Sequence, residues 1–356
     1  GRIQRNQNIL LEGLGRILSD NVSIEVLRDS HERRNIGGSL REELVRFGLF
    51  GVVSDLEFGG AGLKVIDTAL ISERLGYYAA PTPYLGAIIS SAAINLADKG
   101  QKARYLSRLG TGNLRFGLAF SEHSGAKENC HIIRKDDRLS GRSLFVIDSD
   151  SELFLIPDVE RRLFVVRSDN PGFSSRDMST IDITRRFGEV TLECVEGEEL
   201  KFDNPDQDYL SMLLAWARVI IAADTLGACQ RMLDDSVAYA KQRKQFGRVI
   251  GSFQAVKHMC ADMAAKIEPC RAMVWHAACA IDSSLENGNM EVNLCKAHLS
   301  EVGKSVSKTA TEVHGGMGFT DLQGLHYWFK RIGVNRQLLG SPEYLRREAA
   351  SLQNLI

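Results

Sequence analysis

The C-terminal part of the chain carries the pattern that most restricts its fold. From Asp208 onward, Pro269 is the only proline before Pro342, and proline is the residue that most strongly interrupts a helix interior. Apolar residues recur in this stretch at the spacing of one helix face. The pattern therefore predicts a bundle of long helices joined by glycine-bearing turns, near residues 207–243, 252–286 and 290–313.

Two different patterns precede this bundle. Up to about residue 112 the apolar spacing is helical with breaks, whereas the next stretch has short β-type runs separated by Gly, Asp, Asn and Ser. We expect strands at 116–120, 144–147, 153–156, 163–166 and 190–195. The chain is therefore predicted to be α+β, with an N-terminal helical domain (1–112), a central β-barrel or sandwich (113–205) and a C-terminal helical bundle (206–356).

Charge and cysteine usage limit the functional classes. The 356 residues contain 44 Lys and Arg against 45 Asp and Glu, so we expect no field strong enough to bind nucleic acid or a membrane surface. No apolar run approaches the roughly 20 residues of a membrane span, and no signal peptide opens the sequence. Seven cysteines without a Cys-x-x-Cys pair predict reduced core thiols in a cytoplasmic protein, and no metal site.

A basic run interrupts the helical pattern at Arg243-Lys244-Gln245-Phe246-Gly247. On its own it is typical of a solvated helix end. After another helical segment comes His314-Gly315-Gly316-Met317-Gly318, whose glycines let a backbone approach a flat or charged ligand because no Cβ stands in the way. Together and in this order, the two motifs resemble the acyl-CoA dehydrogenase family of flavoproteins, and the resemblance extends over nearly the whole chain.

The resemblance implies the fold of that family, with a C-terminal four-helix bundle, and FAD as cofactor. In the family, the flavin ring lies on one subunit's β domain while its pyrophosphate and adenosine reach a neighbour's helices. Arg243 would then offer a planar fork of donors to the pyrophosphate, and Phe246 would pack beside the cofactor. The other cofactor-binding residues implied are Gln254, a weaker candidate, and the turn residues His314, Gly315, Gly316 and Gly318.

The family's catalytic base is a glutamate that removes the α-proton of an acyl-CoA thioester, and it has no counterpart at either of the family's two positions. One position, in the stretch Leu338-Leu339-Gly340-Ser341, carries Leu339. The other, directly before the arginine that corresponds to Arg218, carries Ala217. No catalytic residue is therefore assigned, and Arg218 is expected to brace the active-site end of its helix.

Three other acids could replace this base. Asp224 lies on the same helix face as the second position, but seven residues at about 1.5 Å each place it roughly 10 Å along the axis. Glu343 and Asp321 are less constrained. The β region departs from the family as well, because Ile147 stands where a flavin-binding threonine is usual and Lys127 stands where a small hydroxyl is usual.

The downstream pattern Gly318-Phe319-Thr320, Leu325-His326 and Lys330-Arg331 resembles a bacterial branch of the family. Several members of that branch are heteromers with one competent subunit, and some serve steroid degradation. We therefore expect a subunit that lacks its own base and completes the flavin site of a homologous partner, in an α2β2 heterotetramer with acyl-CoA at the shared site. The alternatives are a self-sufficient homotetramer with a displaced base, and a flavin-free binding or scaffold protein.

Overall fold

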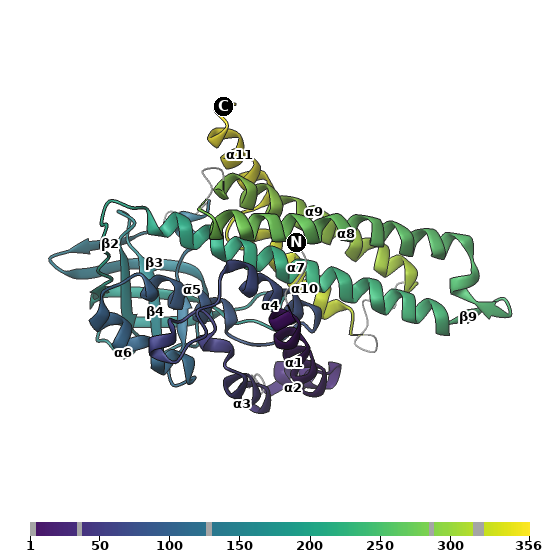
Figure 1. The fold of residues 1–356 in the computed structure, drawn as a ribbon, viewed down its shortest axis with the longest axis horizontal. Coiled ribbons are helices and arrows are strands. Elements are labelled where there is room, and N and C mark those ends of the chain that lie inside the picture. The colour runs from purple at the N-terminus through teal and green to yellow at the C-terminus, as the bar shows by residue number, and fades with distance from the viewer. Residues whose placement is uncertain (1–4, 34–37, 126–129, 285–287, 316–323) are drawn as a thin grey trace. The chain divides into compact units, whose positions relative to one another are not determined.

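The computed structural model describes the chain except for residues 1–4, 34–37, 126–129, 285–287 and 316–323 (Figure 1). The chain forms two compact units. The helical unit comprises Gly1–Glu32, Ala69–Ala80 and Arg218–Ile356, and the mixed unit comprises Arg33–Thr68 and Pro81–Ala217. Each unit buries apolar side chains of its own, as expected for a chain of this length.

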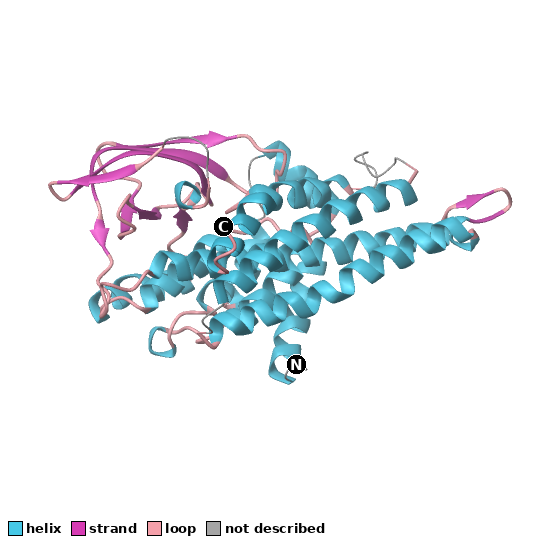
Figure 2. Cartoon of the chain, turned by 90° about the horizontal axis from the view of Figure 1, so that it is seen from above, coloured by secondary structure: helices cyan, strands magenta, loops and turns pink. Residues whose placement is uncertain are grey.

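A single mixed β-sheet forms the strand-containing part of the mixed unit (Figure 2). Its strands follow the order β6-β7-β3-β1-β4-β5-β8, with β2 beside β3. β1 is parallel to β4, and the other pairs are antiparallel. The strands are β1 (Phe116–Leu118), β2 (Ile132–Lys135), β3 (Arg138–Ile147), β4 (Leu153–Pro157), β5 (Leu163–Arg167), β6 (Phe173–Met178), β7 (Phe187–Glu196) and β8 (Glu198–Glu199).

All five predicted strands are present in this sheet, so the central β domain is confirmed. The strands β2, β6 and β8 were not predicted. β6 reads Phe-Ser-Ser-Arg-Asp-Met and is mostly exposed, so it lacks the apolar alternation that would mark it as a strand. It is ordered by pairing with β7 along its whole length. The apolar cluster of the unit includes Val146, Phe154, Phe164, Val190 and Leu192.

Along the chain, the helices of the mixed unit come before and after the strands of this sheet. They are α3 (Gly38–Phe47), the first turn of α4 (Val65–Tyr77), α5 (Tyr84–Asn95), α6 (Lys99–Gly110) and the first residues of α7 (Tyr209–Gln242). The start of α6 is fixed by Asp98, whose side chain accepts a hydrogen bond from the Gln101 backbone N–H at 2.8 Å, because the first N–H groups of a helix have no partner within it.

Long helices make up the helical unit. In addition to the rest of α4 and α7, it contains α1 (Arg5–Asn21), α2 (Ile24–Arg33), α8 (Gln254–Asp282), α9 (Gly288–Val313), α10 (His326–Gln337) and α11 (Pro342–Leu352). The three predicted long helices are therefore confirmed, with ends that differ by a few residues. α8 and α9 pack along one another, and α11 packs on α9 (Figure 1).

One described helix, α7, is long and apolar enough to span a membrane when judged by length and composition alone. The sequence did not predict a run of this kind. However, 89% of its most apolar 18-residue window is buried inside the protein. α7 is therefore a core helix, and its apolar character is explained by packing.

Candidate cofactor-binding site

A short hairpin separates α7 from α8 and carries the basic motif (Figures 1 and 2). β9 (Lys244–Gln245) pairs antiparallel with β10 (Arg248–Val249). The two residues between them, Phe246 and Gly247, have φ angles of 52° and 77°, and two consecutive positive φ values are typical of the tightest hairpin turns. The sequence predicted only a break between helices here, because Phe-Gly is a less common turn pair than Asn-Gly.

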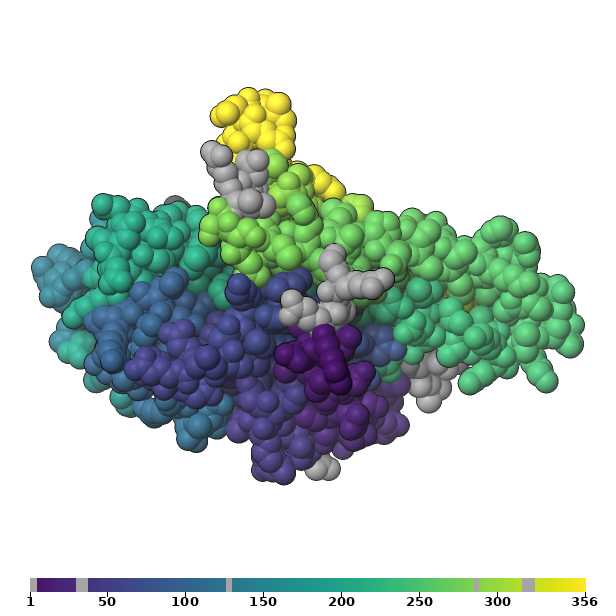
Figure 3. All heavy atoms as spheres, in the orientation of Figure 1, coloured from purple at the N-terminus to yellow at the C-terminus, as the bar shows by residue number. Residues whose placement is uncertain are grey.

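The hairpin presents an exposed aromatic ring among basic side chains. Phe246 is 93% exposed, and Figure 3 shows the hairpin as open surface at the end of the helical unit. Among the described residues, no carboxylate pairs with Arg243, Lys244 or Arg248. The Arg248 guanidinium lies 3.8 Å from the centre of the Phe253 ring. The hairpin therefore offers cations and an apolar surface to a ligand or partner outside the chain.

Arg243 and His314 line one cavity of about 410 Å³. His314 is buried, its ring stacks on Tyr239 with centroids 4.6 Å apart, and its Nδ1 lies 2.8 Å from the Ala310 carbonyl oxygen. Because a carbonyl only accepts, Nδ1 carries a proton. The structure therefore brings two residues of the separate sequence motifs together and fixes the imidazole by stacking and by one hydrogen bond.

A second arginine lies at the same cavity but is already engaged. Arg231 donates from Nε to both oxygens of Asp235 at 3.1 Å and lies 4.6 Å from the centre of the Trp328 ring. Burial raises the pKa of Asp235, and the Arg231 charge opposes that effect. The Arg231 charge is thus used within the protein, whereas Arg243 forms no ion pair with a described carboxylate.

The remaining predicted cofactor residues have different positions. Gly315 follows α9 with φ 59°, and nothing lies within 4 Å of where a Cβ would stand, so the backbone there is open to approach. Gly316 and Gly318 lie outside the described residues. Gln254 is the first residue of α8, is exposed and does not line the Arg243 cavity.

Arg218 and Leu339, which the sequence assigned to one active-site region, are in contact. The Arg218 Nε donates to the Leu339 carbonyl oxygen at 2.8 Å, and its Nη1 donates to Asn293 Oδ1 at 3.3 Å. Leu339 is buried, with φ 57°, and Gly340 follows with φ 122°. Ala217, in the mixed unit, is fully buried. Arg218 therefore donates to the turn between α10 and α11, and its predicted role at an active site stays a prediction.

Sequence reasoning missed a second cation at this turn, Lys296 of α9. Its buried Nζ donates to the carbonyl oxygens of Asn335, at 3.0 Å, and Gly340, at 2.8 Å. Burial, followed by the charges of Arg218 and Arg336, lowers the pKa of Lys296 well below its ordinary value. The only available sign in the sequence was a lysine on the apolar face of a predicted helix.

Two of the three alternative acids have environments that oppose a role as base. Asp224 is buried and accepts from Arg331, through Nε at 2.9 Å and Nη2 at 2.7 Å, and from Asn335 Nδ2 at 2.9 Å. Glu343 has a side chain 67% exposed, and hydrogen bonds at the start of α11, the backbone one first, lower its pKa. Asp321 lies outside the described residues.

The flavin-facing positions predicted in the β region can be placed in part. Ile147 is buried at the end of β3, where it pairs with Leu118 and Phe187. Phe145 lies on a bulge of the same strand with φ 50° and is exposed. Lys127 lies outside the described residues. Among the described residues, no group of three His, Cys, Asp or Glu side chains could hold a metal ion.

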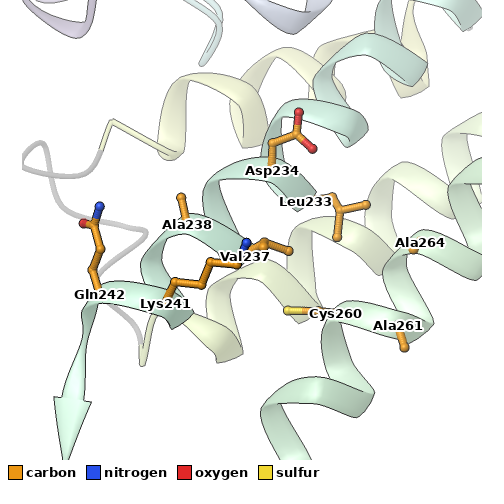
Figure 4. A pocket seen from close by; sticks show the side chains of 9 residues that line it. All are labelled: Leu233, Asp234, Val237, Ala238, Lys241, Gln242, Cys260, Ala261 and Ala264. Atoms are coloured by element: carbon orange, nitrogen blue, oxygen red, sulfur yellow. The ribbon is translucent and has the colours of Figure 1, made fainter. Parts of the chain in front are cut away.

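A groove of about 700 Å³ separates α7 from α8 near the hairpin (Figure 4). Cys260 on α8 points toward Val237 and Lys241 on α7 (Figure 4). Most of the lining is small or apolar, so the groove has few polar groups that would need a partner. The lining residues are Leu233, Asp234, Val237, Ala238, Lys241, Gln242, Cys260, Ala261 and Ala264.

Comparison with known proteins identifies the family. Models of the acyl-CoA dehydrogenase N-terminal and C-terminal domains match residues 6–113 and 208–351. Acyl-CoA dehydrogenase IpdE2 of Mycolicibacterium smegmatis is 30% identical over 98% of this chain and 100% of its own length. A solved variant of the steroid ACAD Tcur3481-Tcur3483 has a TM-score of 0.88 and 28% identity, with 98% of each chain covered.

A further solved structure, the ChsE4-ChsE5 complex from Mycobacterium tuberculosis, has a TM-score of 0.90 at 20% identity and covers 100% of this chain and 99% of its own. At that identity the likeness supports the fold alone. The two solved structures are described as assemblies of two differently named proteins. With both domain models matched and a relative aligned over almost its whole length, the chain belongs to the acyl-CoA dehydrogenase family, whose members oxidise CH–CH bonds and normally bind FAD.

Proposed function

We propose that this chain is a subunit of a heteromeric FAD-dependent acyl-CoA dehydrogenase, that it lacks its own catalytic base, and that it completes the flavin site of a homologous partner. One observation carries the proposal. The exposed hairpin holds Arg243 and Phe246, and Arg243 forms no ion pair with a described carboxylate, while both expected base positions carry aliphatic side chains, Ala217 and Leu339.

The residues at the hairpin fit the nucleotide end of FAD. Arg243 would bind the pyrophosphate with two parallel N–H donors, because a guanidinium matches phosphate oxygens in this geometry. The Phe246 ring would cover an apolar part of the cofactor, and the open backbone at Gly315 would allow close approach. FAD, when bound, supplies the acceptor for the substrate's β-hydride. The residues of this chain bind and orient it.

The partner would dock along the groove between α7 and α8. The residues that line the groove extend along α7 to Gln242, the residue directly before the hairpin motif. A subunit that filled the groove would therefore also contact Arg243 and Phe246. Steroid acyl-CoA is the substrate class we favour, since a related solved structure is described as a steroid ACAD. The free state of all seven cysteines supports a reducing compartment, the cytoplasm.

Copurification tests the proposal. The chain is produced alone and together with a homologous subunit that carries an acid before the arginine matching Arg218. We expect the complex to hold FAD and oxidise an acyl-CoA, and the chain alone to do neither. A yellow, acyl-CoA-oxidising protein from the chain alone would overturn the subunit assignment in favour of a self-sufficient enzyme.

Arg243→Gln tests the cofactor role within the same complex. Loss of a charge-assisted pair with phosphate should weaken FAD binding by about tenfold or more, measured by flavin retained on dilution. Arg347→Gln is the matched control, because Arg347 is an exposed arginine of α11 far along the chain from the hairpin. If assembly and flavin content are unchanged in Arg243→Gln, the chain is a scaffold without a cofactor role.

A further inference from the structure

The helical unit contains another cavity, of about 480 Å³, which shares with the groove between α7 and α8 only the residue Asp234. α1, α4, α7 and α8 all contribute side chains to it. The volume lies within the range of small-molecule sites, which often form between the helices of a bundle. Aromatic rings from Tyr77, Tyr78 and Trp275 line it, together with the apolar side chains of Leu11 and Leu70.

One wall of this cavity is a continuous network of hydrogen bonds between side chains. Arg271 pairs with Glu73 and donates to Gln230 Oε1 at 3.3 Å. Gln230 Nε2 donates to Asp234 Oδ1 at 2.9 Å, and the Tyr77 hydroxyl donates to Asp234 Oδ2 at 2.8 Å. These side chains come from three helices and satisfy one another, so the wall is preorganised. Both carboxylates of the cavity are thereby engaged.

Two donors at the cavity are left without an acceptor among the described residues. Arg74, on α4, is exposed at the mouth of the cavity, and its guanidinium has no ion pair or hydrogen bond there. The Trp275 Nε1, on α8, is buried and has no hydrogen-bond partner. Buried polar groups in native proteins are nearly always satisfied by protein or water, so this unmet indole N–H is available to an acceptor that comes from outside the chain.

We propose that this cavity binds a small planar anion, a carboxylate carried on an aromatic or conjugated ring. The carboxylate would pair with Arg74, whose charge is the one in the cavity that no described carboxylate balances. The ring would lie against Tyr78 and Trp275, and an oxygen of the ligand would accept from the indole N–H. The proposal is independent of the flavin site, because none of these residues lines the Arg243 cavity.

Calorimetric titration with 2-naphthoate tests this proposal, with 2-naphthalenemethanol as the uncharged analogue of the same shape. The titration uses the purified full chain, alone and in complex with its partner subunit. We expect saturable binding of the acid and much weaker binding of the alcohol. In Arg74→Gln the acid should bind about tenfold more weakly or worse and should lose its advantage over the alcohol.

Trp275→Phe keeps the aromatic surface and removes the N–H. It should therefore weaken the binding of 2-naphthoate by a few-fold, about the effect of one neutral hydrogen bond. Arg347→Gln should leave binding unchanged. Equal binding of acid and alcohol, unchanged binding in both cavity variants, or no saturable binding at millimolar probe would each overturn the proposal. Binding to the chain alone that disappears in the complex would overturn it too, because a subunit contact would then fill the cavity. None of these readouts depends on flavin, so they are separate from the test of Arg243.

Discussion

The hairpin at Phe246 and the turn at Leu339 share one backbone feature, but the basic side chain near the hairpin faces solvent and those at the turn are buried. Each has a non-glycine residue with positive φ followed by a glycine with positive φ, at 52° and 77° in the hairpin and at 57° and 122° in the turn. In the hairpin, the nearby cation Arg243 is exposed and forms no ion pair with a described carboxylate. In the turn, the buried cations donate to backbone carbonyls.

This difference separates a binding surface from a rigid core element. Donors that already hold carbonyl oxygens cannot bind a ligand without breaking those bonds, and an unmet buried carbonyl is unfavourable. Donors that face solvent can exchange water for a phosphate. Substitutions in the turn should therefore change stability, and substitutions in the hairpin should change cofactor binding while leaving stability nearly constant.

Asp224→Ala should give the largest effect, because it leaves Arg331 buried without its carboxylate. Asp224 also accepts from Asn335, whose carbonyl receives Lys296, so the pair supports the turn. Breaking a buried ion pair by removing one partner typically costs about 3–5 kcal/mol. Chemical denaturation of the isolated chain measures this loss as a decrease in the free energy of unfolding.

Asp262→Ala is the control for that experiment. Asp262 pairs with Lys266 on the surface of α8, where both side chains are about half exposed, and exposed pairs contribute at most about 1 kcal/mol. Equal losses from the two substitutions would show that the Asp224 pair is not a structural support, and would reopen Asp224 as a candidate base.

The same substitution in the two turns gives the next largest difference. At Gly340 a Cβ would lie 2.8 Å from a Leu345 carbon in addition to an unfavourable φ, so Gly340→Ala should destabilise by about 2–4 kcal/mol. At Gly247 nothing lies within 4 Å, so Gly247→Ala should lose only about 1 kcal/mol, from φ alone. Thermal melts of both variants measure the contrast, and equal shifts would contradict it.

The pH dependence of stability tests the buried amine at the turn. The folded pKa of Lys296 is lowered, so the unfolded chain binds its proton more tightly, and this opposes folding at low pH. This destabilisation is complete below the folded pKa and decreases as the pH rises toward the unfolded pKa of about 10.4. The stability of the wild type relative to Lys296→Met should therefore rise with pH across that window, by at most about 1.4 kcal/mol per pH unit.

Urea denaturation of both proteins at several pH values provides the measurement. Taking the difference between the two proteins removes the contributions of other titrating groups. The charged groups that act on Lys296 are Arg218 from α7 and Arg336 from α10, and Arg336 is itself paired with Glu301. Parallel curves would show that Lys296 titrates normally in the folded chain, and that the turn is held by an ordinary ammonium group.

The three long helices and five of the eight strands in the large sheet could be predicted from the sequence because their apolar spacing is set locally. β6 could not, because its order comes from pairing with β7 and not from its own side chains. The ends of the predicted long helices differ by a few residues since caps and turns, such as the hairpin after α7, depend on backbone geometry that apolar spacing does not encode.

The residues of the candidate site could be predicted where they belong to short sequence motifs. The link from Arg243 to His314 followed from two motifs, and the structure places both at one cavity. Lys296 was missed because its partners are backbone carbonyls of residues far along the chain, and such partners leave no sign in the sequence. Arg331, which pairs with Asp224, belongs to the Lys330-Arg331 motif, but the sequence did not indicate that the two residues pair.

Phe246→Ala should have the smallest effect on the isolated chain and a clear one on the complex. The ring is 93% exposed, and among the described residues its one aromatic contact is an edge contact with Phe253, at 6.3 Å between centroids, so the free energy of unfolding should change by less than about 0.5 kcal/mol. If FAD covers the ring, burial worth about 1.5–3 kcal/mol is lost, and flavin should leave the complex at least about tenfold more readily. A loss of stability without any loss of flavin would make Phe246 a packing residue, and the contrast between the hairpin and the turn would then fail.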